Sequence, residues 1–215
     1  MDVTLEPWTS TGLWPYAIMV GILMSWALYH FLAPESWHEW ASAGVFQAFI
    51  IALYTEMYGF PLTIYILSAF LPLKIPLLHS SGHVWATLLG FGRLGVVIET
   101  IVGYALLLAG ALLVVKGWVK IYFASGLLVD DGVYRFMRHP QYTGIFLVMF
   151  GEVVDWPTIP TLVIFPVITA MYIHLALREE ARLTEKFGAK YRDYQNLVPR
   201  FIPHWNDLRL FFLRF

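Results

Sequence analysis

The stretch from residue 144 to residue 177 reads GIFLVMFGEVVDWPTIPTLVIFPVITAMYIHLAL. It is apolar along most of its length, yet it is too long for one membrane helix, because about 20 helical residues cross a hydrocarbon core of about 30 Å. Asp155-Trp156-Pro157 interrupts it with a charge and with a proline that removes a helical hydrogen-bond donor. We therefore predict a tight hairpin of two membrane helices.

The rest of the chain also has the composition of a polytopic membrane protein. Of its 215 residues, 59% are hydrophobic and only 13% are charged. Three further apolar runs cover residues 14–32, 43–71 and 94–115, and Gly59-Phe60-Pro61 predicts a kink in the second. Together with the hairpin they predict an all-α integral membrane protein of about five spans, folded as a single domain over residues 1–215.

The distribution of basic residues predicts the orientation. None of the 14 Lys and Arg residues precedes Lys74, and all except Lys74 and Arg93 lie at or after Lys116. Because basic loops stay in the cytoplasm, we expect residues 116–142 and the tail after residue 177 to be cytoplasmic and the N-terminus to be outside. The net charge of -1 and the absence of a basic stripe argue against nucleic-acid binding. With no cysteine, the chain has no thiolate nucleophile and no Cys-ligated metal.

The C-terminal tail is expected to pack against the membrane helices. Leu183, Phe187, Tyr191 and Tyr194 recur at helical spacing, so residues 178–195 are predicted to form one amphipathic helix. Residues 198–203 follow as an extended strap, because the prolines in it disfavour a helix.

Charged motifs flank the predicted hairpin on both sides. Arg138-His139-Pro140-Gln141-Tyr142-Thr143-Gly144 leads into it, and Arg178-Glu179-Glu180 follows it. Ionisable groups beside a bilayer are costly unless they are paired or used in function. Both motifs fall on the predicted cytoplasmic side, so we predict that they form one site.

The chain carries an ordered set of motifs: Gly117-Trp118, residues 128–134, residues 138–144, Glu179-Glu180, residues 187–191 and Val198-Pro199. Together these motifs resemble the isoprenylcysteine carboxyl methyltransferase family. The resemblance covers residues 116–203, whereas residues 14–115 supply predicted spans only. It implies S-adenosylmethionine as the cofactor, bound in a cytoplasm-facing pocket, and methyl transfer to a lipophilic or small acceptor carboxylate, thiol or amine. Membrane lipids are further expected partners.

The resemblance also assigns site residues. Arg138 and Glu179 are expected to be catalytic, with Arg138 holding an anionic acceptor or, in the alternative reading, a lipid phosphate. Glu179 and Glu180 point about 100° apart on a helix, so we expect one to meet the cofactor and the other to pair with Arg138 or Arg182. The expected cofactor-binding residues are Lys120, Leu128, Val129, Gly132, Tyr134, His139, Pro140, Tyr142 and Glu180.

For several of these residues a simpler reading stays open. Lys120 suits either a cofactor carboxylate or a snorkelling position at a span end. The loop at residues 128–134 suits either an adenine or an ordinary turn at Asp131-Gly132. Pro140 restricts His139 to extended backbone, which aims the ring away from helical geometry.

Two other functions remain as alternatives. A membrane reductase that uses NADPH shares an Arg-His-Pro-x-Tyr motif, and a non-catalytic lipid-binding protein fits the composition. No metal is expected, because His79 and His83 have no clear third ligand. Glu56 and Glu99 lie in predicted spans and are expected to face protein, water or a substrate path.

Overall fold

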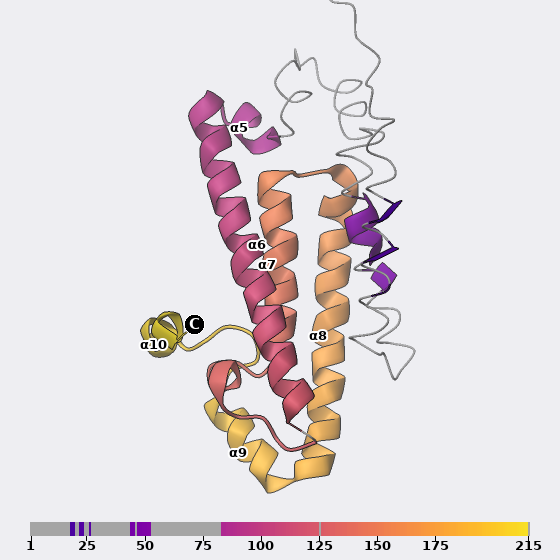
Figure 1. The fold of residues 1–215 in the computed structure, drawn as a ribbon, viewed down its shortest axis with the longest axis vertical. Helices are drawn as coiled ribbons and strands as arrows, with labels where there is room; N and C mark the ends of the chain where they lie inside the picture. The colour runs from indigo at the N-terminus through magenta and orange to yellow at the C-terminus, as the bar shows by residue number, and fades with distance from the viewer. Residues whose placement is uncertain are drawn as a thin grey trace, which may run out of the picture.

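The computed structural model describes residues 83–124 and 126–214, with residues 18–19, 22–23, 26, 44–45 and 47–52 of the N-terminal part (Figure 1). Every regular element in these residues is helical, as the all-α prediction requires. Most of the predicted spans at residues 14–32 and 43–71, and both Glu56 and His79, lie outside the described residues. The count of five spans therefore stays a prediction.

Three long helices lie side by side: α6 (Gly92–Phe123), α7 (Pro140–Asp155) and α8 (Ile159–Phe187) (Figure 1). The short helix α5 (Val84–Leu88) lies at one end of α6. Helices α6 and α8, of 32 and 29 residues, are long and apolar enough to cross a membrane. The apolar run at residues 94–115 is thus helical as predicted, and its helix extends further at both ends.

The predicted hairpin is formed by α7 and α8, but only α8 is long and apolar enough to cross a membrane, because α7 has 16 residues. Its turn lies at residues 156–158, where the sequence interrupts the apolar run. Thr158 caps α8: its hydroxyl accepts a hydrogen bond from the Thr161 backbone N–H at 3.2 Å, and the Thr161 hydroxyl accepts one from the Thr158 N–H at 3.1 Å. This reciprocal capping box satisfies backbone donors that would otherwise be unpaired at the helix start.

The predicted single helix over residues 178–195 is wrong, because the structure divides this segment. Helix α8 continues through residue 177 to Phe187, and a separate helix, α9 (Ala189–Leu197), follows. Gly188 separates them with a φ of +59°, a conformation that costs little only for glycine. The predicted apolar face does form: Tyr191 and Tyr194 are buried against Leu183 and Phe187.

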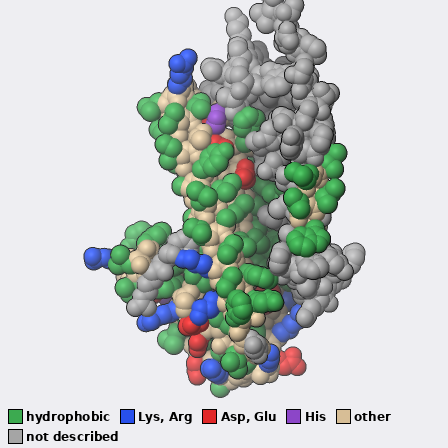
Figure 2. Space-filling model, viewed as in Figure 1, with side chains coloured by type: hydrophobic (Ala, Val, Ile, Leu, Met, Phe, Trp, Pro, Cys, Tyr) green, Lys and Arg blue, Asp and Glu red, His purple; other side chains and the backbone are tan. Residues whose placement is uncertain are grey.

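The end of the chain is a strap followed by a short helix. Residues 198–203 are non-helical, as predicted, and lead into the 3-10 helix η4 (Trp205–Asp207) and helix α10 (Leu208–Arg214). Figure 1 shows α10 to one side of the three long helices. Figure 2 shows hydrophobic side chains over the long helices, with most Lys and Arg side chains of this face toward the end that carries α9 and α10.

Helices α6 and α7 meet along a seam of glycines at seven-residue spacing. A Cβ added to Gly110 of α6 would lie 2.5 Å from the carbonyl oxygen of Gly144 of α7. Gly103 and Gly151 repeat this contact, with 2.9 Å from the Gly103 Cβ to the Gly151 oxygen. Small residues at a membrane-helix interface let two backbones approach closely. The same register brings Gly117 against the first residues of α7, so the seam sets the position at which α7 begins.

A second interface joins α7 to α8. Side chains of both helices are buried together, and Phe49 of the N-terminal part packs against them. The core of this interface consists of Phe49, Ile145, Met149, Val153, Ile168, Tyr172 and Leu175.

We predict that Gly110→Ala destabilises the fold. The added methyl group must displace the α7 backbone rather than a flexible side chain, so the expected loss is about 1–3 kcal/mol, as for other overpacked interfaces. Unfolding in detergent, followed by helical circular dichroism, measures the effect. Gly44→Ala is the matched control, because a Cβ there meets nothing within 4 Å among the described residues. Equal stability of the two variants would contradict a close contact between the α6 and α7 backbones at Gly110.

Candidate active site

The segment that leads into α7 is fixed by the C-terminal strap. The Arg138 backbone N–H donates to the Pro199 carbonyl at 2.9 Å, and the His139 N–H donates to the Arg200 carbonyl at 3.0 Å. His139 is the N-cap residue of α7, with φ −125° and ψ 63°, and Pro140 begins the helix. As predicted, His139 lies outside helical geometry, although its ψ is not that of a fully extended residue. Two segments distant in sequence thus form one backbone unit.

The ring of His139 lies between two consecutive glutamates of α8. Its Nδ1 is 3.4 Å from Glu179 Oε2, and its Nε2 is 3.1 Å from Glu180 Oε1. Consecutive side chains on a helix point about 100° apart. The imidazole lies between the two carboxylates, with one ring nitrogen close to each. The ring is 4% exposed. The two charged motifs that flank the hairpin therefore meet, as predicted.

The protonation of His139 is governed by these two carboxylates. Burial alone would lower the pKa of the imidazole, but hydrogen bonds to Glu179 and Glu180, together with their charges, outweigh it and raise the pKa above its ordinary value. The cationic form of His139 is therefore favoured beside the glutamates.

Glu180 is the buried centre of this charged cluster. Its side chain is 7% exposed, and it accepts hydrogen bonds from Arg200 Nε at 2.8 Å and Arg200 Nη2 at 2.9 Å. Arg138 Nη1 lies 3.4 Å from Glu180 Oε2. The predicted pairing of one glutamate with Arg138 is therefore observed at Glu180, which also contacts His139. A buried carboxylate is tolerated when cations compensate it in this way.

Arg200 is not among the site residues predicted from the sequence motifs. Its signal was present, because it is a basic residue in an otherwise apolar and proline-bounded strap, but its partner lies 20 positions away, beyond the Gly188 break. No spacing rule connects the two residues.

Glu179 occupies the more open side of the cluster. Its side chain is 36% exposed and accepts a hydrogen bond from the Tyr142 hydroxyl at 2.5 Å. The Tyr142 ring stacks on His139, with centroids 5.4 Å apart and planes at 7°. Close by, Arg138 Nε is buried and has no hydrogen-bond partner among the described residues. The cluster thus offers an accessible carboxylate, an aromatic stack and a guanidinium N–H.

Other predicted site residues have structural partners. The Tyr134 hydroxyl donates to the Gly117 carbonyl at 3.2 Å, and the Tyr134 carbonyl accepts from the Tyr194 hydroxyl at 2.6 Å. Tyr134 therefore links α6 to α9 through the loop. Leu128 packs against the buried tyrosines of α9, and Val129 is half-buried.

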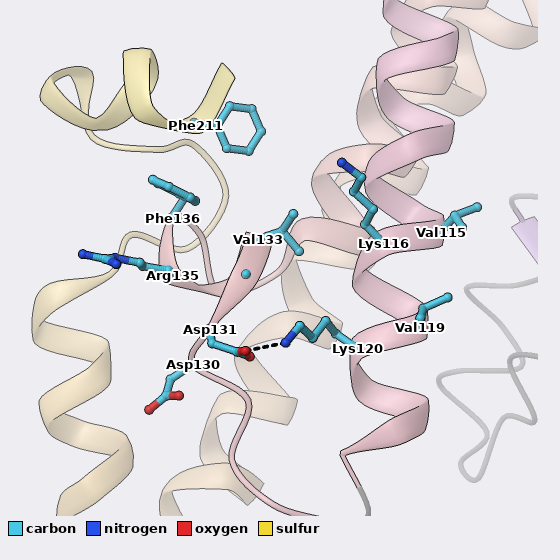
Figure 3. A pocket seen from close by; sticks show the side chains of 11 residues that line it. Val115, Lys116, Val119, Lys120, Asp130, Asp131, Val133, Arg135, Phe136 and Phe211 are labelled. Carbon is cyan, nitrogen blue, oxygen red and sulfur yellow. Dashed lines mark hydrogen bonds and ion pairs between the residues drawn. The ribbon is translucent and has the colours of Figure 1, made fainter. Parts of the chain in front are cut away.

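Lys120 and Gly132 line a cavity of about 790 Å³ between α6, the loop at residues 130–136 and α10 (Figure 3). Lys120 forms an ion pair with Asp131 across it. Of the predicted site residues, only these two line the cavity. Arg138, His139, Pro140, Tyr142, Glu179 and Glu180 gather instead around the charged cluster, so the structure divides the predicted site between two places.

A second group of ionisable residues lies at the opposite end of α6. His83 Nδ1 is 3.2 Å from Glu99 Oε2 and 4.0 Å from Asp155 Oδ1. Glu99 is buried and faces protein, one of the environments expected for an acid within a span. Within residues 83–124 and 126–214, and the short described N-terminal stretches, no group of three or more His, Asp or Glu residues is arranged to hold a metal ion.

Comparison with known proteins indicates a class of enzyme. A family described as phospholipid methyltransferase matches residues 98–190, which include all of α7 and α8. The chain is 36% identical over 78 residues to protein-S-isoprenylcysteine O-methyltransferase of Schizosaccharomyces pombe, covering 36% of this chain and 33% of that protein. These matches confirm the resemblance seen in the motifs.

Two further relatives carry methyltransferase names. Protein-S-isoprenylcysteine O-methyltransferase B of Arabidopsis thaliana is 32% identical over 80 residues, covering 37% of this chain and 41% of that protein. Methanethiol S-methyltransferase of Crocosphaera subtropica is 39% identical over 71 residues, covering 33% of this chain and 27% of that protein. In each case the similarity covers less than half of the relative's length.

We predict that the stability contributed by His139 depends on pH. Because the folded-state pKa is raised, this contribution is present in full below about pH 6.5, the ordinary imidazole value, and is lost as the pH rises through the folded-state pKa. Thermal unfolding at a series of pH values above 6.5 should show a decline in the wild type that is reduced in His139→Gln. His204→Gln, at an exposed position, should retain the wild-type decline. Parallel curves for the wild type and His139→Gln would refute the prediction.

Proposed function

We propose that this chain is an integral membrane methyltransferase that transfers the methyl group of S-adenosylmethionine to a lipophilic or small acceptor. The proposal rests on two independent findings that concern the same part of the chain. The region that matches the phospholipid methyltransferase family includes the hairpin, and the charged cluster brings together the motifs that flank this hairpin. The relatives are named for isoprenylcysteine and methanethiol, so a carboxylate or thiol acceptor is favoured over an amine.

The side chains present suit this cofactor chemically. S-adenosylmethionine supplies an electrophilic methyl group on a cationic sulfur, and it also carries an ammonium, a carboxylate and ribose hydroxyls. The accessible carboxylate of Glu179 suits the ammonium or the hydroxyls, and the partly buried Tyr142 ring lies beside it. Pro140 holds His139 at the helix start. Lys120 remains the proposed carboxylate anchor, and Leu128, Val129, Gly132 and Tyr134 the proposed adenine enclosure.

Arg138 is proposed to hold the acceptor. Its buried Nε has no acceptor among the described residues, whereas Nη1 already faces Glu180. An anionic acceptor beside Nε would gain a charge-assisted hydrogen bond and would be held in line for displacement. Because this reaction needs no bond to the protein, positioning and electrostatics are the contribution of Arg138 and Glu179.

The two glutamates are proposed to differ in role. Glu179 is exposed enough to touch the cofactor or acceptor. Glu180, which the motif resemblance assigned to the cofactor, is buried among Arg138, His139 and Arg200, and this favours a positioning role.

The membrane arrangement belongs to the same proposal. Residues 14–115 are proposed to supply three spans and residues 116–203 the cofactor and acceptor sites, all within one domain over residues 1–215. The N-terminus is placed outside and the charged cluster at the cytoplasmic surface, because the basic residues gather at that end of the sequence.

Ligand-induced stabilisation tests the cofactor class. Purified protein in detergent is titrated with S-adenosylhomocysteine and, separately, with NADPH, while its thermal unfolding is followed. We expect saturable stabilisation by S-adenosylhomocysteine, worth about 2.7 kcal/mol at 100 times its dissociation constant, and none by NADPH. Stabilisation by NADPH alone would favour a membrane reductase, and stabilisation by neither would favour a lipid-binding protein.

A further inference from the structure

The Arg200 side chain donates to both oxygens of Glu180. Its Nε lies 2.8 Å from Glu180 Oε1, and its Nη2 lies 2.9 Å from Oε2. Two parallel hydrogen bonds between a guanidinium and a carboxylate form the strongest and most directional pair that these groups make. The Arg200 side chain is 34% exposed, whereas that of Glu180 is 7% exposed. Arg200 therefore approaches the buried carboxylate from the solvent side of the cluster.

The backbone around Arg200 is fixed against the start of α7. The Arg200 carbonyl accepts a hydrogen bond from the His139 N–H at 3.0 Å, and the Phe201 carbonyl accepts one from the Thr143 hydroxyl at 2.8 Å. The Phe201 ring also lies beside that of His139, with centroids 5.9 Å apart. Because these contacts hold the strap in place, the Arg200 side chain is presented to Glu180 from a fixed backbone.

Arg138 makes only a weak contact with Glu180, because other donors occupy the carboxylate. A carboxylate offers about four lone-pair positions. Besides the two bonds from Arg200, His139 Nε2 lies 3.1 Å from Oε1 and Gln195 Nε2 lies 3.4 Å from Oε2. Arg138 Nη1 is 3.4 Å from Oε2, longer than the about 2.7–2.9 Å of a charge-assisted hydrogen bond. Glu180 therefore balances the charge of Arg138 and leaves its buried Nε, which has no hydrogen-bond partner among the described residues, for another acceptor.

We propose that Arg200 is a positioning residue for methyl transfer: by occupying Glu180, it keeps the guanidinium of Arg138 available to an anionic acceptor. The inference rests on the proposed function, in which Arg138 holds that acceptor. Without the Arg200 side chain, the buried carboxylate loses its two shortest hydrogen bonds and needs another cation to compensate it. Arg138 is 3.4 Å away and turns toward Glu180. Its guanidinium then satisfies Glu180 instead of the acceptor.

Equilibrium binding of a charged acceptor and of its neutral ester to the full chain in dodecyl maltoside tests the proposal. The probes are N-acetyl-S-farnesylcysteine, an isoprenylcysteine with a free carboxylate, and its methyl ester, which lacks that charge. The wild type should bind the carboxylate at least tenfold more tightly than the ester. In Arg200→Gln this preference should fall below threefold, while the affinity for the ester stays that of the wild type. Arg192→Gln, at an exposed position of α9, is the matched control and should keep the full preference.

Two further variants separate positioning from a general loss of structure. Because Arg200 acts through Glu180, adding Arg200→Gln to Glu180→Gln should reduce the preference no further than Glu180→Gln alone. Arg200→Lys keeps the positive charge but cannot donate to both oxygens in the same parallel geometry, so it should show an intermediate preference. Binding of S-adenosylhomocysteine should change less than threefold in Arg200→Gln.

The contrary outcomes are distinct. A preference for the carboxylate that persists in Arg200→Gln would overturn the role of Arg200 and leave the proposed function standing. A wild type without this preference would overturn both the role of Arg200 and that of Arg138 as the acceptor-holding residue. Additive losses in the double variant would show that Arg200 acts on the acceptor directly and not through Glu180. Loss of S-adenosylhomocysteine and of both probes together in Arg200→Gln would show that Arg200 supports the whole cluster and does not specifically position Arg138.

Discussion

The compensation of the buried Glu180 carboxylate is the constraint on which the site depends. Its three cationic partners come from two segments outside α8: Arg138 and His139 precede α7, and Arg200 lies in the strap. Removing one partner of a buried charge pair typically costs about 3–5 kcal/mol, because the other charge is left without compensation. The segment before α7, the end of α8 and the strap are therefore stabilised together or not at all.

The glycine seam also holds the site in place, because it fixes the position of α7. Close backbone contact at Gly110 and Gly144 fixes the register of α7 against α6, and α7 begins directly after His139. The imidazole is thus anchored by a rigid helix on one side and by Glu180 on the other. Glu179 remains on the open side, where a ligand can reach it. A site that holds its ligand chiefly by position needs such fixed surroundings.

Much of this arrangement could be predicted from local sequence, because the length of an apolar run and the residues that interrupt a helix can both be read from neighbouring positions. The hairpin followed from the apolar run and its interruption at Asp155-Trp156-Pro157. The end of α8 did not, because Leu183, Phe187, Tyr191 and Tyr194 keep helical spacing across Gly188, and only the fold shows that Gly188 adopts positive φ. The Glu180–Arg200 pair and the separation of Lys120 from the charged cluster depend on tertiary contacts that no spacing encodes.

Equilibrium binding of S-adenosylhomocysteine to Glu179→Gln tests whether the exposed edge of the charged cluster contacts the cofactor. Glutamine keeps the size of the side chain but removes its charge, and Glu185→Gln on the exposed surface of α8 is the matched control. We expect at least tenfold weaker binding for Glu179→Gln, about 1.4 kcal/mol, and unchanged binding for Glu185→Gln. Wild-type affinity in a folded Glu179→Gln protein would contradict this contact.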